Sequence, residues 1–194
     1  MIDQILFYLK IGFNHIMDIN AYDHLLFLVS ISIIYSFKSW KKLFWIVTFF
    51  TIGHSMSLFI SSFGLYKPNP EIIELLIPIT IIISALSNLF FLNTTKKINY
   101  FTIFVAFSFG LIHGFGFGSF LVKSEFNLDS LIPALLGFNI GVEIGQLIFV
   151  LIILLIFYLN KYLRINTINE YIKNIIFFFL CSFGLFWFIQ RLLT

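Results

Sequence analysis

Imidazole and carboxylate side chains occur inside long apolar stretches of this sequence, where charged residues are otherwise scarce. Asp23 and His24 open the first stretch, His54 lies near the middle of the second, and His113 lies past the middle of the fourth. An ionisable side chain inside a membrane helix costs about 2.5–3.5 kcal/mol on insertion scales, so each is a functional candidate. Neutral imidazole binds borderline divalent ions such as Ni²⁺, Co²⁺, Zn²⁺ and Cu²⁺, and a carboxylate balances their charge. The pattern predicts a metal site of these four residues.

The fifth apolar stretch adds a second carboxylate. Asn139, Glu143 and Gln146 follow one another at i, i+4 and i+7, which places them in one polar stripe of a helix. We expect Glu143 to be a further metal ligand, with Asn139 and Gln146 orienting the ligands from behind. Glycines repeat every fourth residue on the other side of this helix, at Gly137, Gly141 and Gly145, a pattern that favours close packing within the chain or between the subunits of a homo-oligomer.

Five more polar residues are candidates for the second shell or the ion pathway: His15, Ser57, Glu74, Ser84 and Asn88. Simpler interpretations remain open for some of them. Glu74 could simply place a favourable negative charge in the first turn of its helix, and Asp23 could simply be the N-cap of a helix. The whole polar set could also consist of hydrogen bonds between helices, without a ligand.

Composition identifies the elements that must position these residues. Hydrophobic residues make up 60% of the sequence and charged residues only 11%, which indicates an all-α integral membrane protein in contact with lipid. Six stretches approach or exceed the roughly 20 residues that cross a bilayer as a helix. They cover approximately 20–37, 43–63, 72–92, 99–121, 130–159 and 172–192. Short connections predict a single transmembrane domain over residues 1–194.

The first residues and the basic residues predict how the bundle sits in the membrane. Residues 3–18 would form an amphipathic helix that lies in the membrane interface. The connections after the first, third and fifth stretches carry Lys38, Lys41, Lys42, Lys96, Lys97, Lys161, Arg164 and Lys173. This asymmetry predicts both termini outside the cytoplasm, in a bacterial inner membrane. Because the basic residues lie between apolar stretches, they give no support for nucleic-acid binding.

The same polar residues stand in blocks that resemble the HupE/UreJ membrane protein family. The blocks are GFNHIMDINAYDHLLFL (12–28), FTIGHSMSL (50–58), ELLIPITIIISALSN (74–88), FGLIHGFGFGS (109–119) and FNIGVEIGQL (138–147). The resemblance implies a bundle of about six helices associated with nickel or cobalt uptake for hydrogenase or urease maturation. The sequence departs from the family pattern at Ser87, where a glutamate is common.

Two functions of different classes fit these residues. The first is a permease for nickel or cobalt, in which Asp23 and His24 capture the ion and His54, His113 and Glu143 form the central site. The alternative is an intramembrane zinc-dependent hydrolase, in which three histidines hold the metal and a carboxylate activates water on a lipid or membrane-embedded substrate. A third interpretation is a sensor or accessory subunit with a structural polar cluster.

Overall fold

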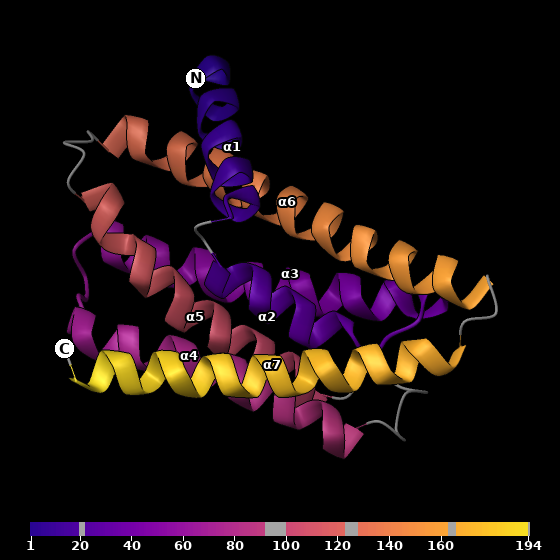
Figure 1. Cartoon of the computed structure of the whole chain (residues 1–194). Coiled ribbons are helices and arrows are strands. Elements are labelled where there is room, and N and C mark those ends of the chain that lie inside the picture. The colour runs from indigo at the N-terminus through magenta and orange to yellow at the C-terminus, as the bar shows by residue number, and fades with distance from the viewer. Residues whose placement is uncertain (20–21, 92–99, 123–127, 163–165, 194) are drawn as a thin grey trace.

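The computed structural model describes residues 1–19, 22–91, 100–122, 128–162 and 166–193. Within these ranges the chain forms seven α-helices and one short 3₁₀ turn, and no strand (Figure 1). The α-helices are α1 (Ile2–Met17), α2 (Tyr22–Ser32), α3 (Trp40–Ser62), α4 (Pro70–Phe91), α5 (Tyr100–Val122), α6 (Leu128–Tyr162) and α7 (Asn166–Leu193). The 3₁₀ turn η1 covers Phe37–Ser39. The prediction of an all-helical fold is therefore confirmed for the described residues.

Five helices are long and apolar enough to cross a membrane, instead of the six that the sequence predicted. The candidate spans are Phe37–Ser62, Pro70–Ser87, Tyr100–Phe117, Leu131–Leu159 and Tyr171–Leu193. The predicted first span contains α2, whose 11 residues extend only about 16 Å at 1.5 Å per residue. The sixth span is not confirmed. Neither is an interfacial position for α1, which stands crosswise to the long helices in Figure 1 and packs against α6.

Glycines let two pairs of helices approach until their backbones touch. A Cβ atom at Gly110 on α5 would overlap the carbonyl oxygen of Phe50 on α3, and one at Gly141 on α6 would overlap that of Leu9 on α1. Along α3 and α5 the contacts advance together, from Gly110 against Phe50 to Gly114 against Ser57, so these two helices run in the same direction. The glycine pattern of the sequence thus serves packing within the chain.

Helix α2 lies against the long helices through a fully buried aromatic side chain. Phe27 stacks on Phe50 of α3 at 4.8 Å between ring centroids and meets Phe109 of α5 edge-on at 5.7 Å. The serine hydroxyls of α2 donate to carbonyls of their own helix, Ser30 to Phe27 and Ser32 to Leu28. This satisfies polar groups inside an apolar bundle.

Helices α4 and α7 form a second layer with its own small apolar core around Ile81, Leu180 and Trp187. Pro70 begins α4, and the side chain of Asn69 accepts a hydrogen bond from the backbone N–H of Glu71 at 2.9 Å. Proline at the first position and asparagine before it are typical of a helix start. The layer is antiparallel, because Gly184 of α7 contacts the backbone of Pro78 and Arg191 pairs with Glu74.

Several basic residues that determine the predicted orientation fall outside the described ranges: Lys96, Lys97 and Arg164. The position of the termini relative to the cytoplasm therefore stays a prediction.

Two glycines of α5 give a matched test of the close helix contact. Gly110→Ala would place a methyl group against the backbone of Phe50, whereas a Cβ at Gly116 meets only side-chain atoms of Ile77 and Ile73, at an ordinary 3.4 and 3.6 Å. We expect Gly110→Ala to lower the free energy of unfolding by about 1–3 kcal/mol, because overpacking shifts the backbone. Gly116→Ala is the control and should leave the thermal unfolding midpoint in detergent near that of wild type. Equal midpoints for the two variants would contradict the contact.

Candidate metal centre

All four histidines of the chain converge, and they come from four different helices. His15 is on α1, His24 on α2, His54 on α3 and His113 on α5. The His24 ring is central, with centroid distances of 4.8 Å to His15, 4.9 Å to His113 and 6.0 Å to His54. Three of the side chains are buried, and that of His15 is partly buried. The glycine contacts described above bring α1, α3 and α5 close enough for this arrangement.

Asp23 fixes the orientation of His24 at the first turn of α2. One carboxylate oxygen, Oδ1, accepts hydrogen bonds from the backbone N–H of His24 and from its ring Nδ1, both at 2.9 Å. Since a carboxylate only accepts, the proton of neutral His24 lies on Nδ1. The other ring nitrogen, Nε2, is buried and has no hydrogen-bond partner. His24 therefore presents a lone pair to the centre of the bundle.

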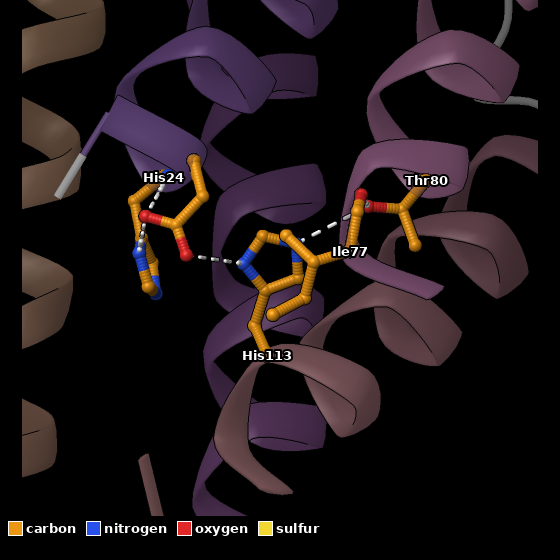
Figure 2. A network of polar contacts seen from close by, with 5 residues as sticks. His24, Ile77, Thr80 and His113 are labelled. Carbon is orange, nitrogen blue, oxygen red and sulfur yellow. Dashed lines mark hydrogen bonds and ion pairs between the residues drawn. The ribbon is translucent and has the colours of Figure 1, made fainter. Parts of the chain in front are cut away.

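Thr80 of α4 fixes the His113 ring in a similar way (Figure 2). Its hydroxyl donates to the carbonyl of Ile77 at 2.6 Å, so the oxygen is left to accept from His113 Nε2 at 3.2 Å. This assigns the proton of neutral His113 to Nε2. The unprotonated Nδ1 faces Asp23 Oδ2 at 4.0 Å and has no hydrogen bond. Thr80 therefore orients the ring, and the lone pair of Nδ1 is left on the side that faces Asp23.

Two overlapping groups of side chains could hold a metal ion among the described residues. In one, His15, His24 and His54 offer ligand atoms that lie within 4.8 Å of one another, and in the other Asp23, His24 and His113 do so. Buried ring nitrogens without a partner occur in all four histidines. Such lone pairs and one carboxylate are donors that borderline divalent ions prefer, and a hydrogen-bonded imidazole is typical of metal ligands. The residues therefore fit a transition-metal ion.

Aromatic rings enclose this cluster and limit its access to water. Phe138 of α6 stacks on His54 at 6.2 Å between centroids, and Phe50 packs edge-on against His113 at 5.4 Å. Phe117 of α5 lies 4.4 Å from the ring of His15. In such a low-dielectric surrounding, the attraction between a bound cation and Asp23 is stronger than in water.

The predicted ligand Glu143 does not join either group. Its Oε1 accepts a hydrogen bond from Thr48 of α3 at 2.7 Å, and Gln146 Oε1 accepts one from Thr51 at 2.9 Å. Asn139 lies beside His54, donates to the carbonyl of Leu135 at 2.8 Å and leaves its buried Oδ1 without a partner. Of the polar stripe on α6, only Asn139 therefore borders the histidine cluster.

The remaining sequence candidates lie around the cluster rather than in it. The Ser57 hydroxyl donates to the carbonyls of Gly53 and His54 in its own helix, at 3.2 and 3.1 Å. Ser84 forms a hydrogen bond of 2.5 Å with Ser30 of α2. Glu74 forms an ion pair of 2.6 Å with Arg191 toward the other end of α4. The side chain of Asn88 lies outside the described residues.

Sequence reasoning did not assign roles to Thr80 and Thr48. Both are single hydroxyls in apolar helices, a type of residue that commonly bonds its own helix. Thr80 does so, and its second role follows only from the way α5 packs on α4. A signal was present, since Thr80 and Ser84 share one face of α4 at i and i+4.

Comparison with known proteins gives one match. The family model described as HupE / UreJ protein matches residues 1–191, which is nearly the whole chain. None of the curated proteins matches, and no solved structure does.

The proton positions in the cluster can be measured. Solid-state NMR of protein with ¹⁵N-labelled histidine, at a pH where the rings are neutral, should find His24 protonated at Nδ1 and His113 at Nε2. Assignment uses His24→Gln and His113→Gln. Thr80→Val keeps the shape of the side chain but removes the acceptor. His113 should then no longer prefer the proton on Nε2, whereas His24 should still carry its proton on Nδ1. A His113 signal that Thr80→Val leaves unchanged would contradict the assigned hydrogen bond.

Proposed function

Because the chain belongs to the HupE/UreJ family, we propose that it is a permease for nickel or cobalt ions. The family relates to nickel and cobalt handling, and five apolar helices make the chain an integral membrane protein. One observation carries the proposal: four buried or partly buried imidazoles and one carboxylate form two groups that share His24, with ring nitrogens that lack partners. A structural hydrogen-bond cluster would use those nitrogens, because buried polar atoms are normally paired.

The sharing of His24 supports transport rather than storage. His24 belongs to the group with Asp23 and His113 and also to the group with His15 and His54. Conduction requires binding that is strong enough for the ion to enter and weak enough for it to leave, which neighbouring sites provide. We infer that the ion meets Asp23 first, because its side chain is 20% exposed while the His24 side chain is only 4% exposed. The ion then passes to the imidazoles of His15 and His54, and His24 remains one of its ligands throughout.

A pocket beside α2 supports a route of exit. Its lining includes Ser84 and Ser87 of α4 and Phe27 of α2. Phe27 also lies 6.0 Å from the His113 ring between centroids, so this side chain borders both the pocket and the histidine cluster. We propose that the ion leaves past Phe27 along the serine hydroxyls, with the pocket on the cytoplasmic side and both termini outside. In this arrangement α1 lies in the outer interface, in a bacterial inner membrane.

The same ligands favour a second candidate, an intramembrane zinc hydrolase. Three imidazoles, from His15, His24 and His54, form a ligand set that catalytic zinc uses, and Asp23 hydrogen-bonds to one of them. In that case the carboxylate would act on water rather than capture an ion. A hydrolase would hold zinc tightly, whereas a permease exchanges its ion.

Metal binding tests the proposal directly. Isothermal titration of chelator-washed, monodisperse protein with Ni²⁺ and Co²⁺ should show reversible binding. His24→Ala should weaken it most, because both groups lose a ligand, and His54→Ala should weaken it by more than the roughly 10–100-fold typical of lost supporting contacts. Glu74→Gln is the control, since Glu74 pairs with Arg191 away from the cluster, and it should bind as wild type does.

The other outcomes are equally clear. Stoichiometric zinc that survives the chelator wash and disappears in both histidine variants would favour the hydrolase. Absence of any histidine-dependent binding of nickel, cobalt or zinc would contradict both candidates.

A further inference from the structure

A second polar position lies on α6, apart from the histidines. Glu143 belongs to the candidate span Leu131–Leu159 and is half-buried against α3. Its Oε1 accepts the 2.7 Å hydrogen bond from Thr48, and it contributes to neither group that could hold a metal. Within the described ranges, Glu143 forms no ion pair.

Glu74, a glutamate on another candidate span whose side chain forms an ion pair, is different in kind. Glu74 lies on α4, where Arg191 of α7 balances its charge at 2.6 Å, and both side chains are more than a third exposed. Carboxylates in membrane helices usually pair in this way or lie on an ion or proton path. Because the partner of Glu143 among the described residues is the neutral hydroxyl of Thr48, the pairing role does not apply to it.

The surroundings of Glu143 favour a proton over a metal cation as its ligand. Hard cations such as Ca²⁺ and Mg²⁺ take six or more oxygen ligands, and here the one hydroxyl in contact is Thr48. Borderline ions prefer imidazole, and the imidazoles gather in the other cluster. A single carboxyl that exchanges one proton needs no further ligand.

Among the described residues, no charged or titratable group on the neighbouring helices is recorded in an ion pair or hydrogen bond with Glu143. The helices packed on α6 bring His15 from α1, His24 with Asp23 from α2, and His54 from α3 to the histidine cluster. Lys42 begins the same helix as Thr48 and lies six residues away, about 9 Å along the axis. Proton exchange at Glu143 can therefore be separated from events at the histidines by substitution.

The two positions share both of their helices. His54 and Thr48 are on α3, whereas Asn139, beside His54, and Glu143 are one turn apart on α6. Thr51, which lies between Thr48 and His54 on α3, donates to Gln146 of α6 at 2.9 Å, and Gln146 Nε2 is buried without a partner. A shift of α3 against α6 when His54 binds an ion would alter the contact of Thr48 with Glu143. This gives the two positions a physical means of coupling.

We propose that Glu143 is a proton-binding site that couples metal transport to a proton moving in the opposite direction. The coupling rests on the proposed permease function, but proton binding at Glu143 does not. Thr48 positions the carboxyl, and Thr51 with Gln146 links it to the helix pair that holds His54.

Labelling by dicyclohexylcarbodiimide in lipid vesicles tests proton binding. The protonated acid adds across one C=N bond: its proton moves to nitrogen and its oxygen bonds to the central carbon. Acyl transfer from that oxygen to the other nitrogen then gives a stable N-acylurea, with no leaving group. Peptide mass spectrometry should find this adduct on Glu143. Glu143→Gln should abolish it and Glu74→Gln should not. An unlabelled Glu143 in wild type would overturn the proposal.

Transport in vesicles that contain a pH-sensitive dye tests the coupling. Wild type should take up Ni²⁺ with a proton signal of opposite direction. Glu143→Gln keeps an oxygen that Thr48 can donate to, so it should fold, bind Ni²⁺ as wild type does and lose the proton signal. Thr48→Val, which keeps the acid, should retain the carbodiimide adduct. An unchanged proton signal in Glu143→Gln would overturn the coupling. If wild type takes up no metal, the permease proposal and the coupling fail, while the adduct still decides whether Glu143 binds a proton.

Discussion

Helix α5 can lie against α3 only because Gly110 has no side chain at the point where it meets the backbone of Phe50. The same is true of α6 and α1 at Gly141. Interfaces of small residues replace the hydrophobic driving force that is missing between helices in lipid. Here the close contacts also have a chemical result, since they bring the imidazoles of α1, α3 and α5 around His24. The centre therefore depends on close contacts between helices at glycines, which carry no functional group themselves.

At the centre, two hydrogen bonds determine what the imidazoles can do. Asp23 accepts a hydrogen bond from Nδ1 of His24, and Thr80 accepts one from Nε2 of His113. Nε2 of His24 and Nδ1 of His113 are therefore left without a partner. Because the Thr80 hydroxyl donates its only hydrogen to the carbonyl of Ile77, it can accept a hydrogen bond from His113 but cannot donate one to it. The partnerless nitrogens are then a property of the fold, and a cation is the ligand that would satisfy them.

Much of this arrangement could be predicted from residue types in apolar stretches. Asp23, His24, His54 and His113 stand out because charge is costly in lipid, and the structure brings all four together. Glu143 is equally conspicuous in the sequence, but helical periodicity gives the face of a residue and not its neighbour, and Thr48 is its contact. His15 is the reverse case: it precedes the apolar stretch, so only the packing of α1 on α6 shows that it belongs to the cluster. The extent of α2 was also beyond prediction, because composition does not show where its helical hydrogen bonds end.

X-ray absorption spectroscopy of the nickel-loaded protein would test the central claim, that the buried imidazoles bind a divalent transition metal, most directly. The account predicts nitrogen and oxygen ligands with the outer-shell scattering of about three imidazoles, and a clear loss of that scattering in His24→Ala. It predicts no sulfur ligand, because the only cysteine, Cys181, lies on α7 away from the cluster. A spectrum of hydrated nickel without imidazole scattering, unchanged by the substitution, would contradict the account.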